Sequence, residues 1–97
     1  MFYLGIDIAK NTHVASLIDE KGKTIFKGFS FSNTTEGGNS LLEIIKKYSE
    51  FTDVTIGMEA TGHYWLSIFS FLAEKDFSVS IINAIVFPLN YLLSFSF

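Results

Sequence analysis

The sequence has no cysteine among its 97 residues, which excludes disulfide bonds, thiolate zinc sites and cysteine nucleophiles. It also has no arginine: the seven basic residues are all lysines, and the formal net charge is -3. A free-standing nucleic-acid-binding protein usually shows a basic face in which arginine binds phosphate with two hydrogen bonds. If this chain meets nucleic acid, most of the electrostatic attraction must therefore come from elsewhere.

Charge is also missing from one end of the sequence, because no charged residue follows Asp76. The uncharged stretch, residues 77–97, is long enough to span a bilayer. Its first part alternates apolar and polar residues, however, and no Lys or Arg follows to anchor the far end. The stretch also contains Asn83, Pro88, Asn90 and four serines. We therefore favour a strand at its start over a membrane helix. At the other end, Met1–Ile8 is too short for a signal peptide and contains Asp7.

What the sequence does contain suits one folded domain, since 48% of the residues are hydrophobic and 18% are charged. Apolar runs and alternation predict strands, and apolar residues at helical spacing predict helices. The expected strands are residues 2–8, 13–19, 24–31, 54–59 and 77–82, and the expected helices are residues 40–49 and 62–75.

Local signals set several of these boundaries. Residues 20–23 predict a tight turn with Gly22 at positive φ. Ser40 and Glu43 form a capping box that predicts the start of the first helix, and the glycine pair 37–38 argues against an earlier start. Thr61 is expected to cap the second helix.

The predicted order of elements is β-β-β-α-β-α-β, which indicates an α/β domain. Three meander strands followed by strands reached through helices give a mixed sheet with helices packed on it. The ribonuclease H-like fold begins in this way, although the order alone does not select it. After residue 83 no helical or strand period remains. We interpret residues 1–83 as the N-terminal part of an incomplete domain, and residues 84–97 as an aberrant apolar tail that follows a truncation or a frameshift.

The most informative feature is a matched pair of short motifs, Gly5-Ile6-Asp7 and Gly57-Met58-Glu59, each at the end of a predicted strand. Side chains alternate faces along a strand, so each acid shares a face with the glycine two positions before it. If the two strands are parallel neighbours, the carboxylates stand side by side at carboxyl strand ends, where open α/β sheets place ligands.

Two carboxylates so close together are unfavourable unless a proton or a cation lies between them. Mg²⁺ binds carboxylate oxygens, and paired metals support in-line phosphoryl displacement. Such a site normally needs more than two carboxylates, and the acids at positions 19, 20, 53 and 76 do not fit it, so the set is incomplete here. A plainer alternative is that these acids face water, or that Glu59 interacts with the first turn of the following helix.

At these residues the sequence resembles the insertion-sequence transposases that have a RuvC-like catalytic domain with an Asp-Glu-Asp-Asp set, enzymes now described as bridge-RNA-guided recombinases. The matching stretches together span about residues 3–83. They are Gly5–Lys10 with His13, Phe31 and Asn33 with Gly37, Gly57–Trp65, and Val79–Asn83. The Met-Glu-Ala-Thr-Gly-His-Tyr run is the specific signal, and Gly-Ile-Asp alone is a weak one.

The resemblance implies that Asp7 and Glu59 are catalytic residues and ligands of Mg²⁺ or Mn²⁺. It implies DNA partners (element ends and target), a noncoding guide RNA, a homo-oligomer in the full-length family, and a DNA-associated location in bacterial or archaeal cytoplasm. Two further aspartates are expected beyond Asn83, and the family's C-terminal domain carries a serine nucleophile. Because this sequence has neither, we expect the chain alone to be poorly soluble and inactive.

Lys10, Thr61 and His63 are possible nucleic-acid contacts. For His63 a capping or packing role is the stronger alternative, and for Lys10 an exposed turn lysine is an equally good account. His13 has no ligand spacing to another histidine or to an acid, and we expect it to be structural.

Two other functions compete with transposition. An actin-like or sugar-kinase-type ATPase shares the start of the sheet, but its phosphate-binding hairpin usually needs glycine, which residues 9–12 lack. The other is a non-functional truncated reading frame with a membrane-seeking tail.

Overall fold

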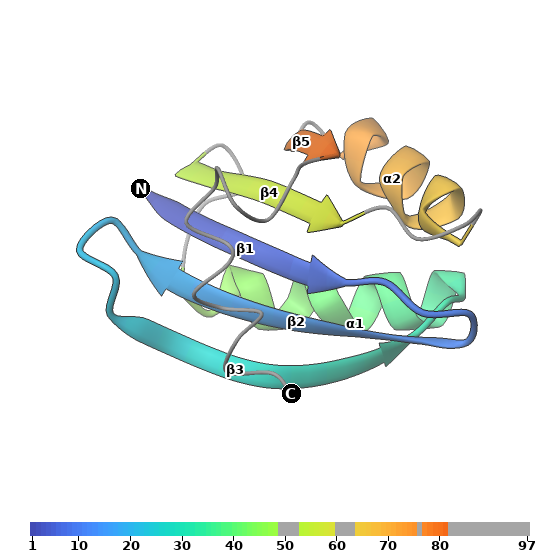
Figure 1. Cartoon of the computed structure of the whole chain (residues 1–97), viewed down its shortest axis with the longest axis horizontal. Helices are drawn as coiled ribbons and strands as arrows, with labels where there is room; N and C mark the ends of the chain where they lie inside the picture. The colour runs from blue at the N-terminus through green and yellow to red at the C-terminus, as the bar shows by residue number, and fades with distance from the viewer. Residues whose placement is uncertain (49–52, 60–63, 76, 82–97) are drawn as a thin grey trace.

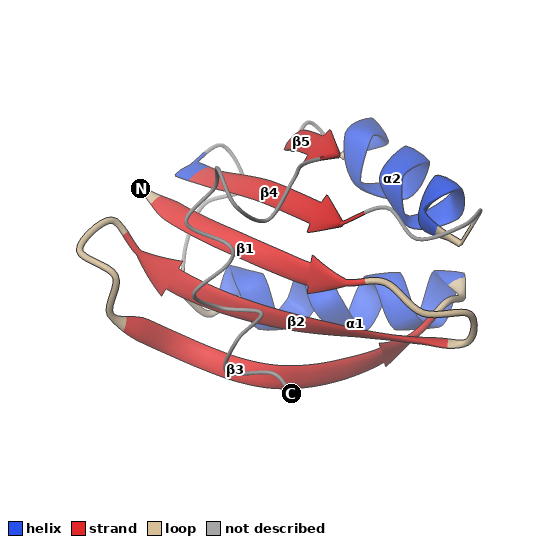
Figure 2. Ribbon diagram, viewed as in Figure 1, coloured by secondary structure: helices blue, strands red, loops and turns tan. Residues whose placement is uncertain are grey.

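The computed structural model describes residues 1–48, 53–59, 64–75 and 77–81. In chain order the elements are β1 (Phe2–Asp7), β2 (Thr12–Asp19), β3 (Thr24–Ser32), α1 (Thr35–Lys46), β4 (Val54–Glu59), α2 (Trp65–Glu74) and β5 (Ser78–Ile81) (Figure 1). The strands form one sheet, and α1 lies across its far side in the view of Figure 2. Every expected strand and helix is present, with boundaries that differ by a few residues at most sites.

The five strands lie in the order β3-β2-β1-β4-β5. β1 pairs antiparallel with β2, and β2 with β3, whereas β1–β4 and β4–β5 are parallel. The three-strand meander therefore leads through α1 into a parallel pair at the centre of the sheet. This confirms the expected α/β mixed sheet, and the arrangement is compatible with the ribonuclease H-like fold.

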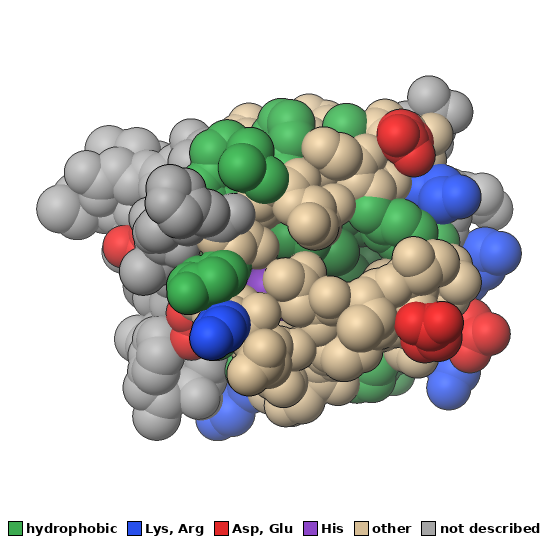
Figure 3. Space-filling model, turned by 90° about the vertical axis from the view of Figure 1, so that its right-hand side faces the viewer, with side chains coloured by type: hydrophobic (Ala, Val, Ile, Leu, Met, Phe, Trp, Pro, Cys, Tyr) green, Lys and Arg blue, Asp and Glu red, His purple; other side chains and the backbone are tan. Residues whose placement is uncertain are grey.

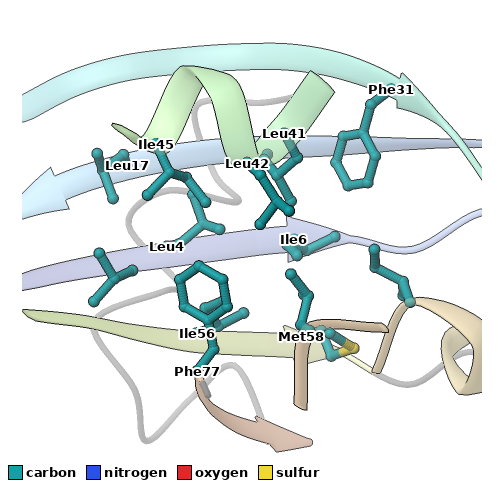
Figure 4. Packing of buried hydrophobic residues seen from close by; sticks show 14 of the residues in the cluster. Leu4, Ile6, Leu17, Phe31, Leu41, Leu42, Ile45, Ile56, Met58 and Phe77 are labelled. Atoms are coloured by element: carbon teal, nitrogen blue, oxygen red, sulfur yellow. The ribbon is translucent and has the colours of Figure 1, made fainter. Parts of the chain in front are cut away.

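Both helices pack into one apolar core on a single face of the sheet. Leu4 and Ile6 of β1 and their register partners Ile56 and Met58 of β4 are completely buried. Figure 4 shows these side chains pointing toward those of α1. The helices contribute Leu41, Leu42, Ile45, Ile68 and Leu72 to the same cluster. Fully burying a side chain of this size stabilises the fold by about 1.5–3 kcal/mol, so this face fixes which way β1 and β4 are turned.

The start of α1 was predicted wrongly. The helix begins at Thr35, not at Ser40, and Thr34 is its N-cap: the Thr34 hydroxyl accepts a hydrogen bond from the Gly37 amide at 3.0 Å. The glycines lie inside the first turns because larger residues would not fit. A Cβ at Gly37 would overlap the Ser32 carbonyl, and one at Gly38 would meet the Phe71 ring at 2.6 Å. Close approach of α1 to β3 and α2 outweighs the low helix propensity of glycine.

The second helix begins at Trp65, later than predicted, with Tyr64 at its N-cap and no side-chain capping bond. The capping role predicted for Thr61 lies outside the described residues, as does the apolar tail at 84–97. Within the described ranges no helix is long and apolar enough to cross a membrane.

The far edge of the sheet is formed by β3, which is irregular. Phe26 and Phe29 pair with Leu17 and Ala15, so two residues of β3 lie opposite Ser16 alone. One of them, Gly28, has φ 71° and donates its amide to the Ser16 hydroxyl at 3.1 Å. A bulge of this kind twists an edge strand and disrupts the regular edge that another chain could pair with.

Candidate functional site

Asp7 and Glu59 are the last residues of β1 and β4, and they are register partners in the parallel pair. Since Ile6 and Met58 are buried in the core, the two acids point to the opposite face of the sheet. Their predecessors on that face, Gly5 and Gly57, are also register partners. Adjacent strands lie about 4.8 Å apart, so the two acidic side chains start from neighbouring positions. On their face of the sheet, the preceding position in each strand is a glycine and carries no side chain. The predicted adjacency is confirmed.

The Asp7 carboxyl lies in an unfavourable electrostatic environment. Burial raises its pKa above the ordinary value of 3.8, and the neighbouring Glu59 carboxylate raises the pKa further. The nearby His13 ring acts in the opposite direction and lowers the pKa of Asp7. Among the described residues, none forms a hydrogen bond or an ion pair with the Asp7 carboxyl. An ionised Asp7 is therefore destabilised by its own site, and a cation at this site would stabilise it.

The turn after Asp7, residues 8–11, is held at three backbone atoms. The Ala9 amide donates to His13 Nδ1 at 3.2 Å. The Asn33 amide donates to the Asn11 carbonyl at 2.8 Å, and Asn33 Nδ2 lies 3.4 Å from the Lys10 carbonyl. Because Thr34, the next residue, caps α1, the turn that follows Asp7 is tied to the start of that helix.

The structure brings together only part of the predicted site. Lys10 is exposed in the turn after β1, and no contact of its ammonium group distinguishes phosphate binding from a solvated lysine. Thr61 and His63 lie outside the described residues. Within the described ranges no three His, Cys, Asp or Glu residues gather closely enough to hold a metal ion.

Figure 3 shows the end of the molecule at which β1 and β4 finish. Basic side chains are scattered over this view, one of them directly beside acidic side chains, and most of the side chains in its central hollow are apolar. A hollow of about 230 Å³ lies between the start of α1 and α2, lined by Asn33, Thr34, Thr35, Ser67, Ile68 and Phe71. The described surface at this end therefore has no concentrated positive charge, which agrees with the absence of arginine.

The donor chemistry of the acid pair suits a divalent cation better than it suits any other group. Two carboxylates supply hard, anionic oxygen ligands, and a cation between them would relieve the burial and the Glu59 repulsion that raise the pKa of Asp7. Two carboxylates replace too little of the hydration shell for tight binding, however. Asp7 and Glu59 thus fit half of a magnesium or manganese site.

Two residues near the site were not identified from the sequence. His13 was expected to be structural because no spacing linked it to an acid, yet it lies close enough to Asp7 to lower the pKa of that carboxyl. The missing signal was the short turn: β1 and β2 pair so that Asp7 faces Val14, and this places His13 beside the end of β1. Asn33 was noticed only as a matching residue, and its contacts to the turn depend on how α1 is placed.

Comparison with known families agrees with this geometry. The family model of the DEDD transposases of IS110 elements, described as a transposase, matches residues 4–88 and so includes both Asp7 and Glu59. No curated protein matches the chain significantly. The family match covers most of the sequence, and the mixed sheet is compatible with the ribonuclease H-like fold expected of such a domain. The chain therefore belongs to the DEDD transposase family of IS110-type insertion sequences, whose members act on DNA.

Proposed function

We propose that this chain contributes Asp7 and Glu59 to a Mg²⁺ or Mn²⁺ site that supports DNA strand cleavage and strand transfer during transposition. The observation that carries the proposal is the register of the parallel strands, which makes the two acids direct neighbours on the face opposite the core. A strand slipped by one position would turn one acid into the core, so this alignment is a specific property of the pairing.

The protein's own part in this chemistry is to hold negative charge in a fixed place. A bound divalent ion would supply Lewis-acid stabilisation of the oxygens of a phosphodiester under attack. Asp7 and Glu59 would hold that ion through carboxylate oxygens, and the buried partners Ile6 and Met58 keep both strands from rotating. The remaining ligands would come from the two later aspartates of the family's Asp-Glu-Asp-Asp set.

The electrostatic attraction for DNA also needs another source, because the sequence carries a net charge of -3. We include Lys10, Thr61 and His63 in the proposal as nucleic-acid contacts from this chain. A noncoding guide RNA and a homo-oligomeric assembly belong to the same proposal. Catalysis by the 97-residue chain alone is not expected, since two carboxylates bind the metal weakly.

The first test measures metal binding directly. We expect Mg²⁺ to shift the backbone amide resonances of residues 5–9 and 57–59 in the 97-residue chain, with weak, millimolar-range affinity because the ligand set is small. Asp7→Asn and Glu59→Gln should each abolish these shifts. Asp19→Asn, at the end of β2, is the matched control and should leave them unchanged. Equal Mg²⁺ shifts in the wild type and Glu59→Gln would exclude the proposed site.

A further inference from the structure

His13 is a buried polar residue at the beginning of β2. Its side chain has no exposed surface, and its ring packs edge-on against Phe31 with the ring centroids 5.4 Å apart. Its Nδ1 atom accepts the Ala9 amide hydrogen at 3.2 Å. Because Nδ1 accepts this hydrogen bond, Nε2 is the donor atom of the ring in this arrangement.

The Nε2 atom is buried and has no hydrogen-bond partner among the described residues. A buried donor without a partner destabilises the fold, and an apolar side chain of similar size would avoid that cost. Packing alone therefore does not explain a histidine here. The one polar contact that the ring does make, to the Ala9 amide, is the feature that an apolar residue could not supply.

Ala9 lies two residues after Asp7, and the residue between them, Ile8, is buried. The chain leaving β1 is therefore fixed on both sides of the acid: by the β1–β4 pairing before it and by the His13 contact after it. We propose that His13 is a positioning residue that holds the turn after β1 and thereby keeps the Asp7 carboxylate beside Glu59 for metal binding. This inference rests on the proposed metal site and adds to it a residue that touches neither metal nor DNA.

The test uses the different shapes of the two amide side chains. Asparagine places an oxygen near the position of histidine Nδ1, whereas glutamine places its polar group near that of Nε2. His13→Asn should therefore keep the acceptor for Ala9, and His13→Gln should lose it. His13→Phe keeps the ring packing against Phe31 without any acceptor, and it guards against a variant that merely fails to fold.

Two readouts are measured on the 97-residue chain: the hydrogen-exchange rate of the Ala9 amide, and the Mg²⁺ dissociation constant from amide shifts. We expect His13→Gln and His13→Phe to exchange the Ala9 amide at least about tenfold faster and to bind Mg²⁺ about tenfold more weakly, the range typical of lost outer-shell contacts. His13→Asn should stay close to the wild type in both readouts. A purely structural histidine would predict that all three variants track stability alone, with His13→Phe the best binder.

The outcomes separate the two proposals. If Glu59→Gln loses Mg²⁺ binding while His13→Gln and His13→Phe bind like the wild type, the positioning role is wrong and the metal site stands. If Glu59→Gln binds Mg²⁺ like the wild type, or the wild type shows no Mg²⁺ shifts, the metal site itself is wrong and the positioning role falls with it.

Discussion

Strands β1 and β2 both end in an aspartate, and the two carboxylates do different work. Asp19, at the end of β2, accepts hydrogen bonds from the Lys21 and Lys23 amides, each at 2.9 Å, and its backbone closes the same turn. The Asp7 carboxylate, at the end of β1, accepts no hydrogen bond from the described residues and lies beside a second acid. The same residue type in the same place thus closes a hairpin at one end of the sheet and leaves an uncompensated charge at the other.

The difference between Asp19 and Asp7 shows that the partners of a strand-end acid decide whether a structural role explains it. Local turn geometry accounts fully for Asp19, because its oxygen stabilises the backbone of its own hairpin. Nothing local accounts for Asp7, whose half-buried carboxyl is raised in pKa by burial and by Glu59. The structural interpretation of strand-end acids therefore holds for the first case, and the second indicates a cation or a proton at the site.

The largest expected effect is the loss of DNA strand cleavage when either acid of the Asp7–Glu59 pair is substituted. In a full-length member of the family, the substitution that corresponds to Asp7→Asn or Glu59→Gln should reduce DNA strand cleavage by about a thousandfold or more, because charge stabilisation in the transition state is lost. Folding should be nearly intact. Cleavage of a plasmid carrying the element's ends, with Mg²⁺ and the element's noncoding RNA, measures the effect.

The control for that experiment is the substitution corresponding to Asp19→Asn, which removes an acid of the same kind from the opposite end of the sheet. It should lower stability by about 1 kcal/mol and leave cleavage within a fewfold of the wild type. Wild-type rates in both Asp7→Asn and Glu59→Gln would remove the catalytic assignment.

Two glycines, one near each end of the sheet, should differ in how much an alanine substitution lowers stability. Gly37→Ala should destabilise the chain by about 3 kcal/mol, because the new Cβ overlaps the backbone carbonyl of Ser32. Neither α1 nor β3 can shift to relieve this overlap without disturbing the packing of the core. Gly22→Ala, in the Asp19 turn, should cost only about 1 kcal/mol, since φ 84° strains alanine but nothing lies within 4 Å. Urea unfolding measures both, and an equal loss in the two variants would contradict the close packing of α1 on β3.

The pH dependence of stability gives a smaller effect. Because the folded-state pKa of Asp7 is raised, the folded state binds the proton more tightly, so this contribution to stability is fully present below pH 3.8 and is lost as pH rises through the folded pKa. Asp7→Asn removes the charge, so its stability relative to the wild type should increase over that interval. Solvent screening limits the gain to under about 1 kcal/mol.

Urea unfolding of the two proteins from pH 3 to 7 follows this difference, and Asp19→Asn serves as the comparison. A stability difference between Asp7→Asn and wild type that falls with rising pH would show that Asp7 is stabilised, not destabilised, as an anion. Added Mg²⁺ should reduce the advantage of Asp7→Asn at neutral pH, because the ion binds only the chain with both carboxylates.

The smallest effect concerns the ion pair between the Met1 amino group and Asp53, at 3.3 Å, which lies at the other end of β1 and β4 from the acids. Both groups are about half exposed, so solvent screens the attraction. Asp53→Asn should change stability by less than about 0.5 kcal/mol, and this change should vanish at high salt. A loss above 1 kcal/mol in thermal or urea unfolding would mean that this end of the parallel pair depends on charge.

The order of elements and the adjacency of Asp7 and Glu59 could be predicted because alternation fixes which residues face the core, and two matching glycine-acid motifs fix the register. The start of α1 could not, because the reason for Gly37 and Gly38 inside the helix is their contact with Ser32 and Phe71, which are distant in sequence or in another element. The contact between His13 and the Ala9 amide could not be predicted for a similar reason. The partner of the His13 ring is a backbone amide across a turn, and no side-chain motif predicts such a contact.

The parallel pairing of β1 with β4 has a kinetic consequence. Asp7 and Glu59 lie more than fifty positions apart in the chain, and α1 lies between their strands in the sequence. The β2–β3 hairpin closes over a short loop and can form early, whereas contacts of long sequence separation form slowly because closing the loop costs entropy first. We therefore expect the acidic pair to be assembled late in folding, so that partly folded chains that hold only the meander carry Asp7 without Glu59 beside it.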